Sequence, residues 1–176
     1  YARHGHTQFT LATGFRGYQF TRHFRDHPSP YAVEVVDTGP ETQTGGRIKR
    51  FDPRETFMVS YGDGLGNIDI SRLVAFHKSH GRLATVTAVR PPARFGALHL
   101  DGKVVKEFDE KPQTGEGWIS GGFFCLEPKV LDYIDGDDTL FEHEPLARLA
   151  EAGQLMAFFH EGYWQPMDTA RERDLL

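Results

Sequence analysis

The stretch Phe57-Met58-Val59-Ser60-Tyr61-Gly62-Asp63-Gly64 carries a short apolar run into an aspartate that is flanked by two glycines. The run predicts a buried strand, and the glycines let the chain turn sharply where that strand ends. Ligands of open α/β sheets bind at the carboxyl ends of the strands, so Asp63 is a candidate metal ligand. Taken alone, Gly-Asp-Gly is more typical of a simple turn.

A second aspartate, Asp168, follows the aromatic and apolar motif Trp164-Gln165-Pro166-Met167 much later in the chain. This residue can equally be the N-cap of a helix that starts at Thr169. Carboxylates bind hard divalent cations well. We therefore expect Asp63 and Asp168 to become neighbours in space and to hold one metal ion between them.

Runs typical of strands and of helices alternate through the first half of the chain, which predicts parallel βαβ units. The fold class that follows is α/β, a Rossmann-like and mostly parallel mixed sheet with helices on both faces. The expected strands are 8–12, 31–36, 57–61 and 83–89, and the expected helices are 18–25, a short one starting at Thr44 and one ending near Gly81.

The second half predicts shorter elements. Asp101-Gly102 is a two-residue hairpin signal between strands 97–100 and 104–108. Thr139 and Glu142 have the spacing of a capping box for a helix that stops at Gly153. The remaining expected elements are strands 122–126, 155–159 and 163–164, a short helix 130–134 and a last helix from Thr169.

The composition, 39% hydrophobic and 26% charged over 176 residues, is that of one globular domain, residues 1–176. A net charge of −5 with scattered basic residues argues against a nucleic-acid partner. The single Cys125 excludes an intramolecular disulfide, and no apolar run is long enough to cross a membrane. We expect a cytoplasmic protein. Because the chain does not begin with Met, we also expect a segment to precede it, and the helix from Thr169 looks cut off, which predicts a further C-terminal end.

Three other polar motifs have two readings each. Lys111, which precedes Pro112 after a strand, is either a solvated hairpin end or a point charge for a phosphate. Gly121-Gly122 is either a close backbone crossing or the floor beneath a polar ligand. Arg47, after two glycines, is either a surface arginine or, beside open backbone N–H groups, a polyphosphate contact. A dinucleotide-binding glycine pattern is incomplete, since Asn67 replaces its third glycine.

Read in order, a set of motifs resembles the sugar-1-phosphate nucleotidyltransferases, and within them the members that use CTP and glucose 1-phosphate. The family opens with a strand that leads to a Gly-rich loop containing Gly-Thr-Arg, followed by a Lys in a Pro-Lys-Pro setting. Both are absent here, so the resemblance implies that a first strand-loop-helix unit is missing. We therefore expect the 176-residue chain by itself to be inactive. The motifs are Val36-Asp37-Thr38-Gly39, Thr44-Gly45-Gly46-Arg47, Tyr61-Gly62-Asp63-Gly64, Arg94-Phe95-Gly96-Ala97-Leu98, Glu110-Lys111-Pro112, Gly121-Gly122-Phe123-Phe124 and Trp164-Gln165-Pro166-Met167-Asp168-Thr169.

The resemblance implies nucleotidyl transfer from CTP to α-D-glucose 1-phosphate, giving CDP-glucose and pyrophosphate. It implies Mg²⁺ bound by Asp63 and Asp168, which with Lys111 would be the catalytic residues. It also implies a homo-oligomer and a part in making sugars for surface polysaccharide such as the lipopolysaccharide O-antigen. The implied binding residues are Thr42, Arg47 and Gly62 for the nucleotide, and Tyr61, Gly96, Glu110, Lys111 and Gly121 for the sugar phosphate.

Two alternatives stay open at this point. One is a non-catalytic regulatory protein that binds nucleotide sugars in the same pocket. The other is a related uridylyl- or thymidylyltransferase, since the residues that choose the base are not identified.

Overall fold

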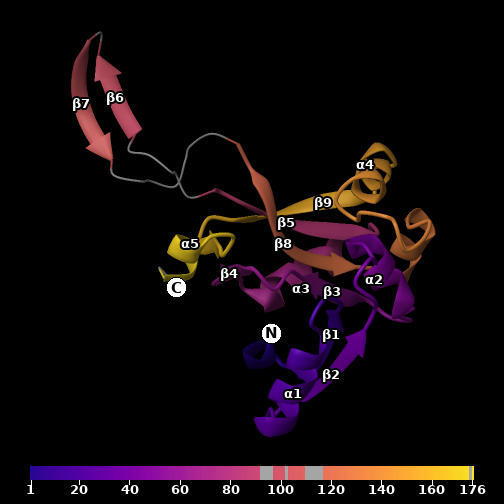
Figure 1. Cartoon of the computed structure of the whole chain (residues 1–176). Coiled ribbons are helices and arrows are strands. Elements are labelled where there is room, and N and C mark those ends of the chain that lie inside the picture. Colours follow the sequence, from indigo (N-terminus) through magenta and orange to yellow (C-terminus); the bar gives the residue numbers. More distant parts are fainter. Residues whose placement is uncertain (92–96, 102, 110–116, 175) are drawn as a thin grey trace. The chain divides into compact units, whose positions relative to one another are not determined.

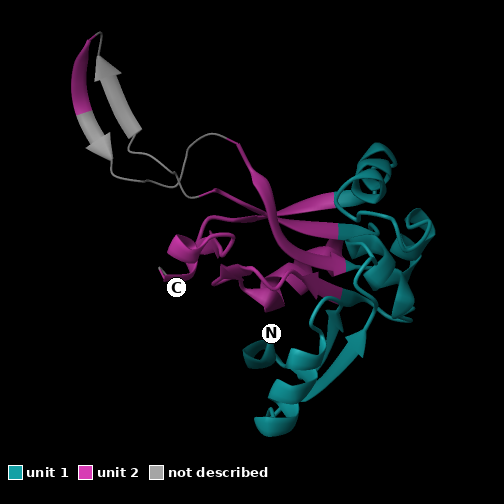
Figure 2. Cartoon of the chain, viewed as in Figure 1, with its two compact units in different colours: residues 1–57, 81–84, 126–155 teal, residues 58–80, 85–125, 156–176 magenta. Residues whose placement is uncertain are grey.

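The computed structural model describes residues 1–91, 97–101, 103–109, 117–174 and 176. Contacts within the chain divide it into two compact units (Figure 2). Unit 1 comprises Tyr1–Phe57, Gly81–Ala84 and Leu126–Leu155, and unit 2 comprises Met58–His80, Thr85–Cys125 and Met156–Leu176. The single domain expected from the composition stays a prediction. No helix among the described residues is long and apolar enough to span a membrane.

Unit 1 begins with a short 3₁₀ helix η1 (Ala2–His4) and a parallel βαβ unit, as the alternating pattern predicts (Figure 1). Its elements are β1 (Gln8–Thr13), α1 (Tyr18–Asp26) and β2 (Ala32–Asp37). The two strands pair in register from Gln8 opposite Ala32 to Thr13 opposite Asp37. Both strands therefore end at the same edge, and the loops after Thr13 and Asp37 lie together there.

The helix α2 (Thr44–Arg50) packs closely against residues 137–139 of unit 1. A Cβ atom added to Gly46 would lie 2.5 Å from the Cα atom of Asp137. The N–H of Gly45 donates to the Thr139 carbonyl at 2.9 Å. The expectation that the N–H groups of the glycine pair stay open to an anion is thus wrong for Gly45. These glycines permit close packing, and Gln43 rather than Thr44 occupies the N-cap position.

The capping box expected at Thr139 and Glu142 does not form. The hydroxyl of Thr139 accepts from the N–H of Gly136 at 3.1 Å, and Glu142 accepts from the Thr44 hydroxyl at 2.6 Å. The helix α4 (Glu144–Glu151) has His143 at its N-cap position without a side-chain bond, and it follows the 3₁₀ helix η2 (Pro128–Tyr133). Its end is as predicted, because Gly153 takes a left-handed φ of 64°.

A mixed sheet of four strands has the order β3-β8-β5-β9. The strands are β3 (Phe57–Ser60), β8 (Ile119–Leu126), β5 (Ala84–Val89) and β9 (Leu155–His160). Their terminal residues Phe57, Ala84, Leu126 and Leu155 belong to unit 1 and the rest to unit 2. Backbone bonds join Tyr61 to Gly122 and Glu127 to Leu83, so β8 begins where β3 ends and ends where β5 begins. β8 is therefore antiparallel to both of its neighbours.

The core of unit 2 lies between this sheet and the helix α3 (Ile70–His80), whose Leu73 is fully buried. Phe124, Cys125 and Val89 are fully buried as well. Cys125 is part of this core and is not in a disulfide.

Two pairs of short strands complete the fold. β4 (Gly64–Gly66) pairs antiparallel with β10 (Trp164–Pro166), and β10 leads to α5 (Ala170–Asp174). β6 (Ala97–Asp101) pairs antiparallel with β7 (Val104–Asp109), as predicted. Gly102 of the expected hairpin turn lies outside the described residues. β4 was not predicted, since two of its three residues are glycines, which disfavour strands.

Candidate functional site

The pairing of β4 with β10 brings the two aspartates together. In this ladder Gly64 stands opposite Pro166, and one step further the N–H of Met167 donates to the carbonyl of Asp63 at 2.7 Å. Asp63 directly precedes β4 and Asp168 comes directly after Met167, so the two acids lie just beyond the same end of the ladder. Both are exposed. The expectation that Asp63 and Asp168 become neighbours agrees with the structure, and the metal ion between them stays a prediction.

Asp168 is not the N-cap of the helix that follows it. Thr169 and Glu172 form a capping box, in which the Thr169 hydroxyl accepts from the Glu172 N–H at 3.2 Å. Glu172 accepts in return from the N–H groups of Asp168 and Thr169, at 3.0 and 2.9 Å. Because Thr169 does the capping, the carboxylate of Asp168 is available for a ligand.

The two carboxylates fit a magnesium ion. Within the described parts of the chain, neither the Asp63 nor the Asp168 side chain has a hydrogen-bond or ion-pair partner. The described part of the chain contains no group of three or more His, Cys, Asp or Glu side chains that could hold a metal ion. Mg²⁺ is commonly bound by one or two carboxylates together with water and substrate phosphates, which is the donor set that two exposed aspartates offer.

A tightly packed glycine pair lies beside β4. A Cβ atom on Gly121 would come within 2.7 Å of Val89, and one on Gly122, whose φ is 73°, within 2.8 Å of the Tyr61 ring. The buried indole of Trp164 donates to the Gly121 carbonyl at 2.9 Å. These contacts match the reading of the glycine pair as a close backbone crossing. The sugar-phosphate roles of Tyr61 and Gly121 stay predictions.

Gly62 differs from this pair. A Cβ atom there would have no neighbour within 4 Å among the described residues, and Gly62 is exposed. The space directly before Asp63 is therefore open to a ligand.

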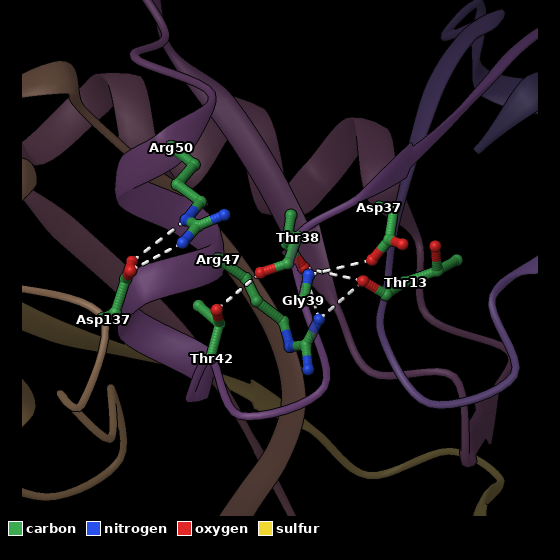
Figure 3. A network of polar contacts seen from close by, with 8 residues as sticks. All are labelled: Thr13, Asp37, Thr38, Gly39, Thr42, Arg47, Arg50 and Asp137. Atoms are coloured by element: carbon green, nitrogen blue, oxygen red, sulfur yellow. Dashed lines mark hydrogen bonds and ion pairs between the residues drawn. The ribbon is translucent and has the colours of Figure 1, made fainter.

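In unit 1 a buried polar network joins the ends of β1 and β2 to α2 (Figure 3). Arg47 donates from Nη1 to the Thr13 carbonyl at 2.8 Å and to the Thr38 hydroxyl. The Thr38 hydroxyl itself donates to the Thr13 carbonyl at 2.8 Å, and Thr42 donates to the Thr38 carbonyl. We call Thr13, Thr38, Thr42 and Arg47 the Arg47 network. All three threonines are buried.

The Arg47 network contains two of the residues predicted to bind the nucleotide, Thr42 and Arg47. Arg47 is half-buried and so is not a solvated surface arginine. A Cβ atom on Gly14 would lie 2.7 Å from Nη2 of Arg47, so the backbone after β1 runs against the guanidinium. Sequence reasoning missed Thr13 and Gly14. The signal was the Thr-Gly pair that follows each of the two strands, Thr13-Gly14 and Thr38-Gly39.

The chemical capacity of this network is to bind an anion. Within the described residues Arg47 uses only Nη1 for protein contacts, which leaves its other N–H groups as donors. A cation at the carboxyl ends of parallel strands lies where α/β proteins bind phosphates.

An ion pair supports the helix that carries Arg47. Arg50 donates to Asp137 through two bonds, Nε to Oδ1 at 3.0 Å and Nη2 to Oδ2 at 2.6 Å. The hydrogen bond from Arg50 holds the pKa of Asp137 below its usual value, and the same bond raises the pKa of Arg50. Both groups are exposed, so the pair fixes geometry more than it adds stability.

Three predicted sugar-phosphate residues, Gly96, Glu110 and Lys111, lie outside the described residues. The structure therefore brings together Tyr61, Gly62, Asp63, Gly121 and Asp168 within unit 2, and Thr42 with Arg47 within unit 1.

Comparison with known proteins gives a consistent result. Residues 45–174 match the family model described as nucleotidyl transferase. Glucose-1-phosphate cytidylyltransferase of Salmonella typhi is 41% identical over 199 residues, covering 98% of this chain and 77% of that protein. Mannose-1-phosphate guanyltransferase of Saccharomyces cerevisiae is 29% identical, covering 99% of this chain and 52% of that protein. The crystal structure of HddC from Yersinia pseudotuberculosis has the same fold, with a TM-score of 0.74 and 22% identity over 99% of this chain and 79% of that chain.

Proposed function

This chain belongs to the nucleotidyl transferase family, and on that premise we propose that it transfers the cytidylyl group of CTP to α-D-glucose 1-phosphate, giving CDP-glucose and pyrophosphate. The choice of substrates rests on the similarity to the Salmonella typhi glucose-1-phosphate cytidylyltransferase, at 41% identity over 98% of this chain. The structural observation that carries the proposal is the β4–β10 pairing, which sets two exposed carboxylates at one end of a ladder.

The reaction needs little covalent help from the protein. The phosphate of the sugar is already ionised, so it needs no general base to attack the α-phosphorus of CTP. The barrier comes from bringing two anions together in line and from the charge that builds up as pyrophosphate leaves. Positioning and cationic groups are the contributions that matter most.

Asp63 and Asp168 would hold the magnesium ion. Bound Mg²⁺ supplies charge neutralisation and Lewis acidity at phosphate oxygens. The two side chains have no described protein partner to give up when they bind it, because Thr169 and Glu172 cap α5 without them.

The remaining residues bind and orient the two substrates. On the nucleotide side, Arg47 is anchored through Nη1 to the ends of β1 and β2, so its other N–H groups would meet the phosphates at little entropic cost. Thr42 and Gly62 are the other residues proposed to bind the nucleotide. On the sugar side, Lys111 would contribute a positive charge to the incoming phosphate. The other proposed sugar-side residues are Tyr61, Gly96, Glu110 and Gly121.

The test is pyrophosphate release by the full-length polypeptide with glucose 1-phosphate and each of four nucleoside triphosphates. We expect CTP to be consumed, and Asp63→Asn and Asp168→Asn each to lower kcat/KM by about two orders of magnitude, or roughly 3 kcal/mol. Asp132→Asn is the matched control, because Asp132 is an exposed aspartate of η2 in unit 1.

Each other result has a definite meaning. If the protein consumes UTP or dTTP but not CTP, the proposed choice of cytosine is wrong, while the assignment as a nucleotidyltransferase stands. Tight binding of CDP-glucose without pyrophosphate release would favour a regulatory protein. Wild-type kcat/KM in both aspartate variants would refute the role given to the acid pair. The cytoplasmic location, the homo-oligomer and the supply of sugar for O-antigen stay predictions.

A further inference from the structure

Two histidines lie side by side at the end of the helix α1 in unit 1. His23 belongs to the last turn of α1, and His27 occupies its C-cap position. Their rings are stacked, with centroids 4.9 Å apart and an angle of 23° between the ring planes. Both residues are exposed. Residues at this helical spacing are neighbours on one face, so the two rings can act on the same ligand.

A hydrogen bond fixes the tautomer of His27. Its Nδ1 atom lies 3.2 Å from the carbonyl oxygen of His23. A carbonyl oxygen only accepts, so Nδ1 carries the proton and donates it. The Nε2 atom of the neutral ring then keeps its lone pair. Histidines that bind metal ions typically donate their other ring N–H to a backbone carbonyl or a carboxylate in this way.

The remaining ring nitrogens of the pair are available to a ligand. In the described part of the chain, neither Nε2 of His27 nor a ring nitrogen of His23 has a hydrogen-bond partner. Bonds from zinc to imidazole nitrogen are about 2.0–2.1 Å long, so two nitrogens on one tetrahedral ion lie about 3.3 Å apart. Because the two rings are exposed, a small turn about their side-chain bonds can bring one nitrogen of each to that separation.

The charges around the pair set the strength of the site. The C-terminal end of a helix carries a partial negative charge, which favours a cation beside His23 and His27. Both histidines line a groove of about 780 Å³ together with Asp26 and Arg22. Arg25 pairs with Asp26 at 2.9 Å, and the charge of Arg22 opposes a cation in the groove. No third His, Cys, Asp or Glu ligand joins the pair among the described residues.

We propose that His23 and His27 form a metal site at the end of α1 that takes a borderline divalent ion, Ni²⁺, Cu²⁺ or Zn²⁺, with water as its other ligands. Imidazole suits these ions, whereas Mg²⁺ prefers the oxygen ligands of Asp63 and Asp168. The pair lies outside residues 45–174, which match the family model, and the inference does not depend on the proposed function. A bound ion ties the last turn of α1 to the residue that ends it.

Calorimetric titration of the untagged full-length protein with CuCl₂, NiCl₂, ZnCl₂ and MgCl₂ tests the site. We expect Cu²⁺ to bind more tightly than Ni²⁺ and Zn²⁺, and excess Mg²⁺ not to displace it. His23→Gln and His27→Gln should each weaken Cu²⁺ binding about tenfold or more, because one imidazole is left to hold the ion. Arg22→Gln should strengthen binding about threefold, because it removes a repelling charge.

The chain offers a matched control in His143. This exposed histidine lies at the N-cap position of α4, also in unit 1, and has no histidine beside it at helical spacing. His143→Gln should therefore leave the affinity for Cu²⁺ unchanged. An equal loss of affinity in His143→Gln and His23→Gln would mean that single histidines bind the ion, and the paired site would be wrong.

Two further measurements report on the pair without a binding constant. Nitrogen NMR of the metal-free protein should show the proton of His27 on Nδ1, and a proton on Nε2 would contradict the fixed tautomer. Zn²⁺ should slow the hydrogen exchange of residues 22–27 in the wild type but not in His23→Gln. Cu²⁺ binding that survives both histidine substitutions would overturn the proposal, whether or not the protein releases pyrophosphate.

Discussion

Replacing Gly122 by alanine is the sharpest test of the packing beside the acid pair. The substitution has two separate costs. Gly122 has a φ of 73°, where an alanine is disfavoured by about 1 kcal/mol. Its Cβ atom would lie 2.8 Å from Cδ2 of Tyr61, so the ring must move, at an overpacking cost of about 1–3 kcal/mol. We expect the free energy of unfolding to fall by about 2–4 kcal/mol.

Three other glycines separate these two costs in urea unfolding followed by circular dichroism. Gly153 has the left-handed φ, 64°, but an added Cβ atom would meet no described atom within 4 Å. Gly153→Ala should therefore lower the free energy of unfolding by about 1 kcal/mol. Gly121 has no left-handed φ, but an added Cβ atom would lie 2.7 Å from Val89. Gly121→Ala should therefore lower the free energy of unfolding by about 1–3 kcal/mol. Gly136→Ala carries neither and should change stability by less than about 0.5 kcal/mol.

The reasoning fails if Gly122→Ala loses no more than Gly153→Ala. That result would mean that the Tyr61 ring moves aside freely. Tyr61 would then not be held over the glycine backbone, and its proposed role in binding the sugar phosphate would lose its structural support.

Three further substitutions test polar groups outside the acid pair. The Thr87 hydroxyl is fully buried without a hydrogen-bond partner in the described structure, so Thr87→Val should raise the free energy of unfolding by about 1 kcal/mol. Thr85→Val should lower it by about 1–3 kcal/mol, because the Thr85 hydroxyl bonds to His77 and His80, each at 2.8 Å, and a gain there would contradict the argument. Asp137→Asn should lower the urea midpoint at neutral pH. The difference from wild type should shrink as the pH falls through the depressed pKa of Asp137, since protonation then removes the charge of the wild type too, and a pH-independent difference would count against the ion pair.

Periodicity and turn chemistry were enough to predict most elements of the fold. The helix α3 followed from an apolar face at helical spacing, and the parallel β1–α1–β2 unit from alternating patterns. These signals are local, so one sequence carries them. β4 carries no such signal, because Gly64-Leu65-Gly66 forms a strand only through its pairing with β10.

Polar partners were the harder part of the prediction. Thr139 with Glu142 and Thr169 with Glu172 share one spacing, but only the second pair caps a helix. In the first pair, Thr139 instead accepts from the N–H of Gly136, three residues earlier, and Glu142 accepts from Thr44, a tertiary contact that no local pattern contains. The prediction that the two aspartates form one site came from their chemistry and from their positions after apolar runs.

Arg47 shows the same limit of local reasoning. Its motif indicated a cation near phosphates. The sequence did not indicate that one of its nitrogens is committed to Thr13 and Thr38 at the ends of two strands. This structural role of Arg47 is visible only once the strands have been paired, and its role in binding the nucleotide stays a prediction.

The ladder between β4 and β10 has a consequence for biosynthesis. Asp63 leaves the ribosome long before Trp164, Gln165 and Pro166 are made, and without these residues the strand at Gly64–Gly66 has no partner. A nascent chain that ends between β9 and β10 therefore contains all four strands of the sheet and their apolar core but still lacks the pair of adjacent acids. The proposed magnesium site is therefore complete only once Asp168 has been made, long after Asp63, and translation products that stop between these residues would lack it.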